Sequence, residues 1–115
     1  MKEHRNIEVQ GKVKEIDFLY YTELFAIERN INGFIQNGSL SRIYIEAEAD
    51  ESRLDELEDY LKNSPLGLHV TSVNAEKGEV KDYKRFRVKY ERRLMKNKKP
   101  ALTAKVFRLI KKIFS

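Results

Sequence analysis

One stretch decides the fold, and it reads Val9-Gln10-Gly11-Lys12-Val13-Lys14-Glu15-Ile16-Asp17-Phe18-Leu19-Tyr20-Tyr21-Thr22. Its first part, residues 9–13, alternates along the chain as a half-buried β-strand does. A short connection over residues 14–17 then leads into a helix that opens at Phe18. Strand-to-helix junctions commonly hold phosphate, because free backbone N–H groups and the positive end of the helix dipole meet there. The layout suggests an anion site, whereas two carboxylates and a leucine at the junction argue against one.

The first predicted helix carries an apolar stripe at helical spacing, formed by Tyr20, Leu24, Ile27 and Ile31 with Phe25 beside them. The segment Asn30–Gly33 is expected to end this helix, because glycine is common just after a helix C-terminus. Residues 34–36 then predict a short strand. Asn37-Gly38 is a frequent pair in type I′ hairpin turns, so a hairpin through Ser39 is expected to lead into the next strand.

The second half of the chain predicts a strand, a helix and two further strands. Arg42–Ala49 alternates cleanly, and either Asp50 or Ser52 is expected to cap the helix that follows. The buried stripe of this helix is expected at Leu54, Leu57 and Leu61, and residues 63–67 end it.

The two remaining strands follow a turn signal each. A strand over residues 68–76 is expected to place Val70 and Ser72 on one face, with Thr71 and Val73 on the other. After the turn at residues 77–79, a last strand over residues 85–90 is expected to turn Phe86, Val88 and Tyr90 inward. The order β-α-β-β-α-β plus a short final strand predicts an α+β, ferredoxin-like fold, with two helices on one face of an antiparallel sheet.

Composition limits the chain to one small domain of 115 residues, 41% apolar and 36% charged. The absence of cysteine excludes disulfides and thiol chemistry, and it favours the reducing cytoplasm. No apolar run approaches the roughly 20 residues of a membrane span, and Met1–Arg5 does not resemble a signal peptide. His4 and His69 lack partners at metal-ligand spacing, and no Ser-His-Asp or P-loop pattern occurs, so neither a metal nor a cofactor is expected.

Charge divides the chain into two parts. Residues 1–91 hold 14 basic and 18 acidic residues, a net charge of −4, whereas residues 92–115 hold 9 basic residues and no acid. We therefore expect a folded domain over residues 1–91, followed by a basic linker and a C-terminal helix over residues 92–115.

The quoted stretch resembles the acylphosphatase family, whose first motif is matched at Val9, Gly11, Val13, Phe18 and Thr22. The second motif of that family is similar to Gly33-Phe34-Ile35-Gln36-Asn37-Gly38. The resemblance extends over nearly all of residues 5–90 without large insertions, and it implies the same β-α-β-β-α-β fold.

The resemblance also implies a set of site positions. Acylphosphatases hydrolyse small carboxyl-phosphate anhydrides; loop amides and an arginine hold the phosphate, and an asparagine orients the attacking water. The asparagine corresponds to Asn37, which a turn role alone would also explain. The family's phosphate-loop positions correspond to Lys14, Glu15, Ile16, Asp17, Phe18 and Leu19. Because the arginine position is Leu19 and two loop glycine positions are acidic, the resemblance predicts a catalytically degenerate member.

Basic and apolar residues of the C-terminal segment separate onto two sides of the expected helix. Its apolar side consists of Leu102, Val106, Leu109, Ile110 and Ile113. Its basic side carries Lys105, Arg108, Lys111 and Lys112, and the preceding linker carries Arg92, Arg93, Lys96, Lys98 and Lys99. Such a helix suits packing on its own domain or on a second copy, an anionic membrane or protein partner, or nucleic acid. The membrane alternative would place the chain at the periphery of a membrane surface.

The sequence thus predicts a degenerate acylphosphatase-like domain that acts as a binding or assembly module through its basic C-terminal helix. One alternative is an active acylphosphatase with a rebuilt anion site, and only this alternative has a small acyl phosphate as its substrate. The other is a nucleic-acid-binding module of ferredoxin-like fold. Lys84–Tyr90 is similar to the basic-aromatic strand of single-stranded RNA binders, but it lacks their glycines, and its apolar residues are expected in the core.

Overall fold

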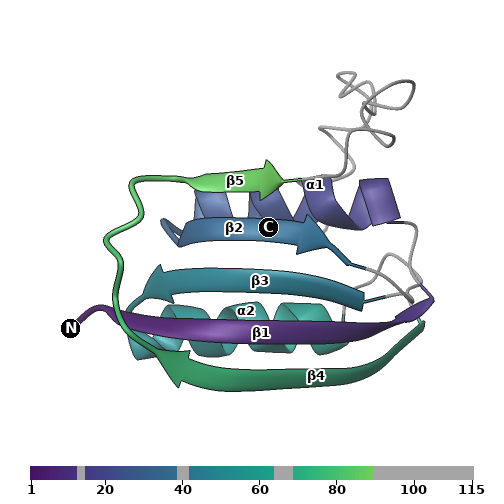
Figure 1. Ribbon diagram of the computed structural model, residues 1–115. Coiled ribbons are helices and arrows are strands. Elements are labelled where there is room, and N and C mark those ends of the chain that lie inside the picture. The colour runs from purple at the N-terminus through teal and green to yellow at the C-terminus, as the bar shows by residue number, and fades with distance from the viewer. Residues whose placement is uncertain (13–14, 39–41, 64–68, 90–115) are drawn as a thin grey trace.

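Five strands form one sheet, and two helices cover one of its faces (Figure 1). The computed structural model describes residues 1–12, 15–38, 42–63 and 69–89. Its elements are β1 Glu3–Lys12, α1 Glu15–Glu28, β2 Asn32–Asn37, β3 Arg42–Ala49, α2 Glu51–Asn63, β4 His69–Gly78 and β5 Phe86–Lys89. The strand order β4-β1-β3-β2-β5 confirms the ferredoxin-like plan. The expectation of a wholly antiparallel sheet is wrong for β5, which pairs parallel to β2.

β1 begins six residues earlier than the predicted strand at Val9. The sequence pattern did not indicate the first part of β1, because its residues are polar and their burial depends on contacts that periodicity does not show. Arg5 faces the helices and is only 9% exposed, with its guanidinium paired to Asp55 and Glu58 of α2. These hydrogen bonds outweigh the effect of burial and raise the pKa of Arg5. Position 13, the end of the predicted strand, lies outside the described residues.

The buried face of α1 matches the predicted stripe only in part, since Phe25 and, just after the helix, Ile31 are buried as predicted. Its buried residues are Phe18, Leu19, Thr22, Phe25 and Ala26. Ile27, expected in the core, is 54% exposed. The helix also starts at Glu15, so most of the predicted connection belongs to its first turn. Apolar residues occur on both sides of this helix, and the packing against the sheet decided which side is buried.

Asn30, and not Gly33, provides the special backbone conformation that ends α1. Asn30 is left-handed with φ 54°, and the N–H of Ile31 donates to the carbonyl of Ala26 at 2.9 Å. This is the hydrogen bond expected of a helix closed by one left-handed residue. Gly33 lies in β2 with φ 141°, where an added Cβ would stand 1.8 Å from the carbonyl oxygen of Glu46. Glycine is required there because the backbones of β2 and β3 approach closely.

The predictions for β3 and α2 are confirmed. The carboxylate of Asp50 accepts a hydrogen bond from the N–H of Arg53 at 3.1 Å, so Asp50 is the N-cap and its pKa is lowered. The buried residues of α2 are Leu54, Leu57, Tyr60 and Leu61. The helix ends at Asn63; residues 64–67, predicted to break it, lie outside the described residues.

A β-bulge in β4 overturns the predicted faces of that strand. Gln10 of β1 pairs with Ser72, but the next residue, Gly11, pairs with Val70. Thr71 is therefore an extra residue, and its hydroxyl donates to the carbonyl of Gln10 at 3.1 Å. Because of this extra residue, Val70 and Val73 both pack against the core.

Residues 79–85, which we call the strap, carry the chain from β4 at one edge of the sheet to β5 at the other (Figure 1). The inward positions of Phe86 and Val88 are confirmed, since Phe86 is 4% exposed and Val88 packs on the core. Tyr90 lies outside the described residues. In the described part of the chain, neither helix is long and apolar enough to cross a membrane.

Candidate functional site

The start of α1 carries most of the residues that the resemblance assigns to a phosphate loop. Phe18 and Leu19 are 0% and 1% exposed and belong to the hydrophobic core. Glu15 and Ile16 lie in the first turn of α1, and Asp17 is half-buried in the same turn. Lys14 lies outside the described residues.

Acidic residues occur in the first turn of α1, at Glu15 and Asp17. Acidic residues in the first turn of a helix interact favourably with the positive end of its dipole. Burial raises the pKa of the Tyr21 phenol, and the negative charge of Asp17 raises it further. The negative charge of Asp17 therefore lies at the start of α1, among the positions that the resemblance assigns to the phosphate loop.

Asn37 is held in the last rung of the β2–β3 ladder, opposite Ile43. A type I′ turn needs positive φ at both central residues, and Asn37 has no positive φ, so it does not form the turn that its sequence suggests. Its side chain is 5% exposed, and its Oδ1 atom is buried without a hydrogen-bond partner among the described residues. The hydroxyl oxygen of Thr22 on α1 is also buried and without a hydrogen-bond partner among the described residues. Buried polar atoms of this kind are those that an ordered water or a ligand satisfies.

The predicted surface-binding residues fall outside the described residues, which end at Lys89. They are Arg92, Arg93, Lys96, Lys98, Lys99, Lys105, Arg108, Lys111 and Lys112. The structure therefore brings Phe18 and Leu19 together with the core, holds Asn37 at the end of β2, and leaves the basic segment untested.

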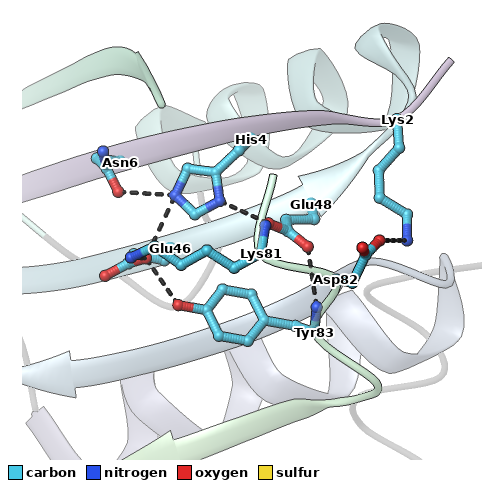
Figure 2. A network of polar contacts seen from close by, with 8 residues as sticks. All are labelled: Lys2, His4, Asn6, Glu46, Glu48, Lys81, Asp82 and Tyr83. Atoms are coloured by element: carbon cyan, nitrogen blue, oxygen red, sulfur yellow. Dashed lines mark hydrogen bonds and ion pairs between the residues drawn. The ribbon is translucent and has the colours of Figure 1, made fainter. Parts of the chain in front are cut away.

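Sequence reasoning missed a buried polar network beneath the strap (Figure 2). His4 and Glu48 are 2% and 1% exposed, and the Nδ1 atom of His4 lies 2.7 Å from Glu48 Oε2. Glu48 also accepts hydrogen bonds from the backbone N–H groups of Lys81 and Tyr83. Glu46 accepts from the Tyr83 hydroxyl at 2.8 Å and from Lys81 Nζ at 3.0 Å. Two carboxylates of β3 thus hold both the backbone and the side chains of the strap.

This network lowers the pKa of both carboxyl groups. Burial alone would raise the pKa of Glu48, but the hydrogen bonds from Lys81, His4 and Tyr83 outweigh it. The pKa of Glu46 is lowered for the same reason, because Lys81 and Tyr83 overcome the effect of burial. Burial and the bond to Glu46 raise the pKa of Tyr83. The ionised carboxylates are therefore the form that the fold requires.

The only sequence signal for this network is the alternation of β1 and β3. His4, Glu46 and Glu48 occupy positions that face away from the helices, which predicts exposed side chains. The pairing of His4 with Glu48 across the two strands, and the strap above them, bury those side chains instead. Among the described residues, no group of three His, Asp or Glu side chains is placed to hold a metal ion.

Comparison with known proteins identifies the fold and the family. Residues 5–88 match the acylphosphatase family. An acylphosphatase from Archaeoglobus fulgidus is 34% identical over 84 residues, which cover 73% of this chain and 94% of that protein. A solved acylphosphatase from Coxiella burnetii has a TM-score of 0.72 at 27% identity, covering 76% of this chain and 93% of that one. For an acylphosphatase from Bacillus subtilis the TM-score is 0.71 at 27% identity, with 78% and 100% covered. Because the matching family extends over most of the chain, this protein belongs to the acylphosphatase family.

Proposed function

We propose that this chain is a catalytically degenerate member of the family that acts as a binding or assembly module through its basic C-terminal segment, residues 92–115. The observation that carries the proposal is Leu19. By the motif resemblance it stands where the family has its phosphate-binding arginine, and it is packed in the core at 1% exposure. A side chain buried in this way presents no donor to a substrate.

Magnitudes favour the loss of hydrolysis. A hydrogen bond to a charged group contributes about 1.5–3 kcal/mol, and about 1.4 kcal/mol is tenfold in rate. Losing the guanidinium alone therefore lowers activity about 10- to 100-fold. A carboxylate about 6 Å from a phosphate adds a repulsion of about 3 kcal/mol at an effective dielectric constant of about 20, less where water screens it. Glu15 and Asp17 both contribute in this direction.

One observation favours the second candidate, an active acylphosphatase with a rebuilt anion site. The buried, unpartnered Oδ1 of Asn37 suits the orientation of a water molecule, which is the role that the resemblance assigns to this residue. A water molecule oriented by Asn37 does not provide a positive partner for the negative charge of the substrate, so we rank this candidate second.

The binding role rests on the charge of the C-terminal segment. Nine basic residues and no acid follow a domain of net charge −4. A segment of this kind suits an acidic surface, whether of this domain, of a second copy or of an anionic partner. The cysteine-free composition supports a cytoplasmic location, with peripheral membrane contact as the alternative.

The hydrolysis of acetyl phosphate or benzoyl phosphate tests the catalytic half of the proposal. We expect no phosphate release above the buffer rate for the wild type, and the same trace for Asn37→Ala. Release by the wild type that Asn37→Ala abolishes would establish the active alternative and overturn the proposal.

The gain-of-function arm combines Leu19→Arg with Glu15→Gly and Asp17→Gly. Recovery of hydrolysis in this triple variant alone would support an intact scaffold that lacks its phosphate ligands. Leu19 is buried, so the long arginine side chain must reach solvent along the helix start. Circular dichroism therefore accompanies each variant, and the wild type with Asn37→Ala still decides the question where the triple variant does not fold.

The binding half is tested by neutralising the C-terminal segment. Lys105→Gln, Lys111→Gln and Lys112→Gln together remove three positive charges and keep the chain length. We expect this variant to lose self-association in sedimentation velocity, or binding to vesicles of phosphatidylcholine and phosphatidylserine, relative to the wild type. Equal behaviour of the two proteins in both assays would contradict the binding role.

A further inference from the structure

A basic groove of about 270 Å³ lies where β5 meets β2. Its lining residues are Gly33, Phe34, Tyr83, Lys84, Arg85, Arg87 and Lys89. We call it the β5 groove. It belongs to the folded domain, so the inference drawn from it goes beyond the role proposed for residues 92–115.

The four basic residues of the β5 groove differ from most other cations of the domain. Most basic side chains of the described part form ion pairs with carboxylates, as Lys2, Arg5, Arg29, Arg42, Arg53, Lys77 and Lys81 do. Lys84, Arg85, Arg87 and Lys89 are all exposed, and within the described ranges their side chains make no ion pair or hydrogen bond. Four neighbouring, unneutralised charges of one sign suit an anionic ligand.

The groove opens onto the sheet face opposite the two helices. Because Phe86 and Val88 point to the core, the alternation of β5 directs Arg87 and Lys89 to the opposite face. There the Nζ atom of Lys89 lies 3.9 Å from the ring centroid of Phe34. The ring of Tyr83 meets the ring of Phe34 edge-on, with 5.9 Å between their centroids. The β5 groove thus combines cations with aromatic rings.

Carboxylates lie beside the β5 groove on the sheet face opposite the helices. Beside the β5 groove lies a second depression of about 460 Å³, whose lining includes Glu8, Glu46 and Glu76. It also includes Gln36 and the 37% exposed ring of Tyr44. Glu8 and Glu46 pair with Arg42 and Lys81, so among the described residues Glu76 is the carboxylate of this lining that has no ion pair. Phosphates are therefore attracted to β5 more strongly than to the middle of the sheet.

The geometry points to single-stranded nucleic acid as the ligand, with its phosphate backbone along the β5 groove and its bases directed toward Tyr44 and Gln36. Proteins that bind single strands combine a cationic groove with aromatic rings on which bases stack. An anionic membrane is a poorer fit, because a bilayer laid on this face would meet the carboxylates that a strand along β5 avoids. The basic residues of β5 could also serve to keep this edge strand from pairing with another chain. Charge of either sign would do that, and neither the groove nor the aromatic rings would be needed.

The test uses the full chain and a labelled single-stranded oligonucleotide of about 12 nucleotides, followed by fluorescence anisotropy at about 50 to 200 mM salt. The variant Arg87→Gln/Lys89→Gln removes two groove charges. Lys62→Gln/Lys77→Gln is its matched control, because it removes two exposed charges from α2 and β4 and leaves the same net charge.

We expect the groove variant to bind roughly 10- to 100-fold more weakly at low salt, with the slope of log K against log salt reduced by about 1.4 for two lost phosphate contacts. The control should keep the wild-type slope. Tyr44→Leu should weaken binding roughly 5- to 100-fold without changing the slope, since one stacked base is lost. Each measurement is repeated with the Lys105→Gln/Lys111→Gln/Lys112→Gln substitutions present, so that binding by the β5 groove is distinguished from binding by the C-terminal segment.

Equal affinity and slope for the groove variant and its control would overturn the proposal. The proposal would also be overturned if the groove variant lost binding to phosphatidylserine vesicles but kept its binding to the oligonucleotide, because that result assigns the groove to a membrane. The hydrolysis assay does not enter this test, so the β5 groove and the proposed loss of catalysis fail or hold separately.

Discussion

Replacing Glu48 by alanine should release the strap and destabilise the whole domain. The Glu48 carboxylate is 1% exposed and accepts hydrogen bonds from the ring of His4 and from the backbone N–H groups of Lys81 and Tyr83. Its removal leaves three donors, of which the His4 ring is buried and the two N–H groups are partly buried, without this acceptor. The strap positions β5, and β5 covers the edge of β2 through the parallel ladder that begins at Gly33. Loss of the carboxylate is therefore felt beyond the strap.

The expected cost is about 3–5 kcal/mol, the range for removing one partner of a buried charged network. With a urea m value of about 1.5 kcal/mol/M, this loss lowers the unfolding midpoint by roughly 2–3 M. Glu48→Gln keeps the shape and one acceptor oxygen but loses the charge, so we expect about half of that effect. Glu76→Gln, exposed on β4, is the matched control and should stay within about 0.5 kcal/mol of the wild type.

Urea unfolding followed by circular dichroism measures these differences, and hydrogen exchange locates them. The amides of Lys81 and Tyr83 should exchange much faster in Glu48→Ala, because their acceptor is gone. A loss below about 1 kcal/mol, with both amides still protected, would refute the assignment of Glu48 as the residue that holds the strap.

Two further predictions concern pH and the first helix. Glu46 and Glu48 have lowered pKa values in the folded state, so their contribution to stability is present above the ordinary value of 4.5 and is lost as the pH falls below it. Unfolding free energies measured down to about pH 3 should show this loss, and Glu48→Gln should reduce its slope; an unchanged slope would contradict the linkage. Phe18→Ala should cost about 3–5 kcal/mol and Ile27→Ala less than about 1 kcal/mol, because Phe18 is fully buried whereas Ile27 is 54% exposed. Equal midpoints for these two variants in urea would contradict the difference in burial between Phe18 and Ile27, and a lower midpoint for Ile27→Ala would favour the predicted face.

Local signals predicted β3 and α2 well. The alternation of Arg42–Ala49, the capping residue Asp50 and the spacing of Leu54, Leu57 and Leu61 each depend on neighbours within a few residues. Such patterns are determined by backbone geometry alone, which a single sequence records. The order of elements followed from them.

Features set by distant contacts were not predictable in the same way. The extra residue Thr71 appears only when β4 is aligned with β1, and it reverses the faces of half the strand. The buried side of α1 depends on the sheet beneath it. His4 and Glu48 are 44 residues apart, so no spacing rule links them. The family resemblance assigned Leu19 to the arginine position and Asn37 to the water-orienting position, whereas the burial of Leu19 and the unpartnered Oδ1 of Asn37 needed the structure.

The strap network and the family site lie at opposite ends of the sheet. His4 stands at the start of β1, whereas α1 begins after the end of β1 and Asn37 closes β2 at that same end (Figure 1). Asn37 lies opposite Ile43, which lies opposite Val9, five residues along β1 from His4. At about 3.3 Å per residue, this separates His4 from the level of Asn37 by roughly 17 Å, beyond the screening length of about 8 Å at physiological ionic strength. Charges at one end therefore have little influence on protonation or anion binding at the other. The stability that Glu48 contributes and the activity that the Leu19→Arg/Glu15→Gly/Asp17→Gly variant is designed to restore can thus be measured as independent properties. An effect of Glu48→Gln on hydrolysis by that variant, once folded, would show that the two ends are coupled through the sheet.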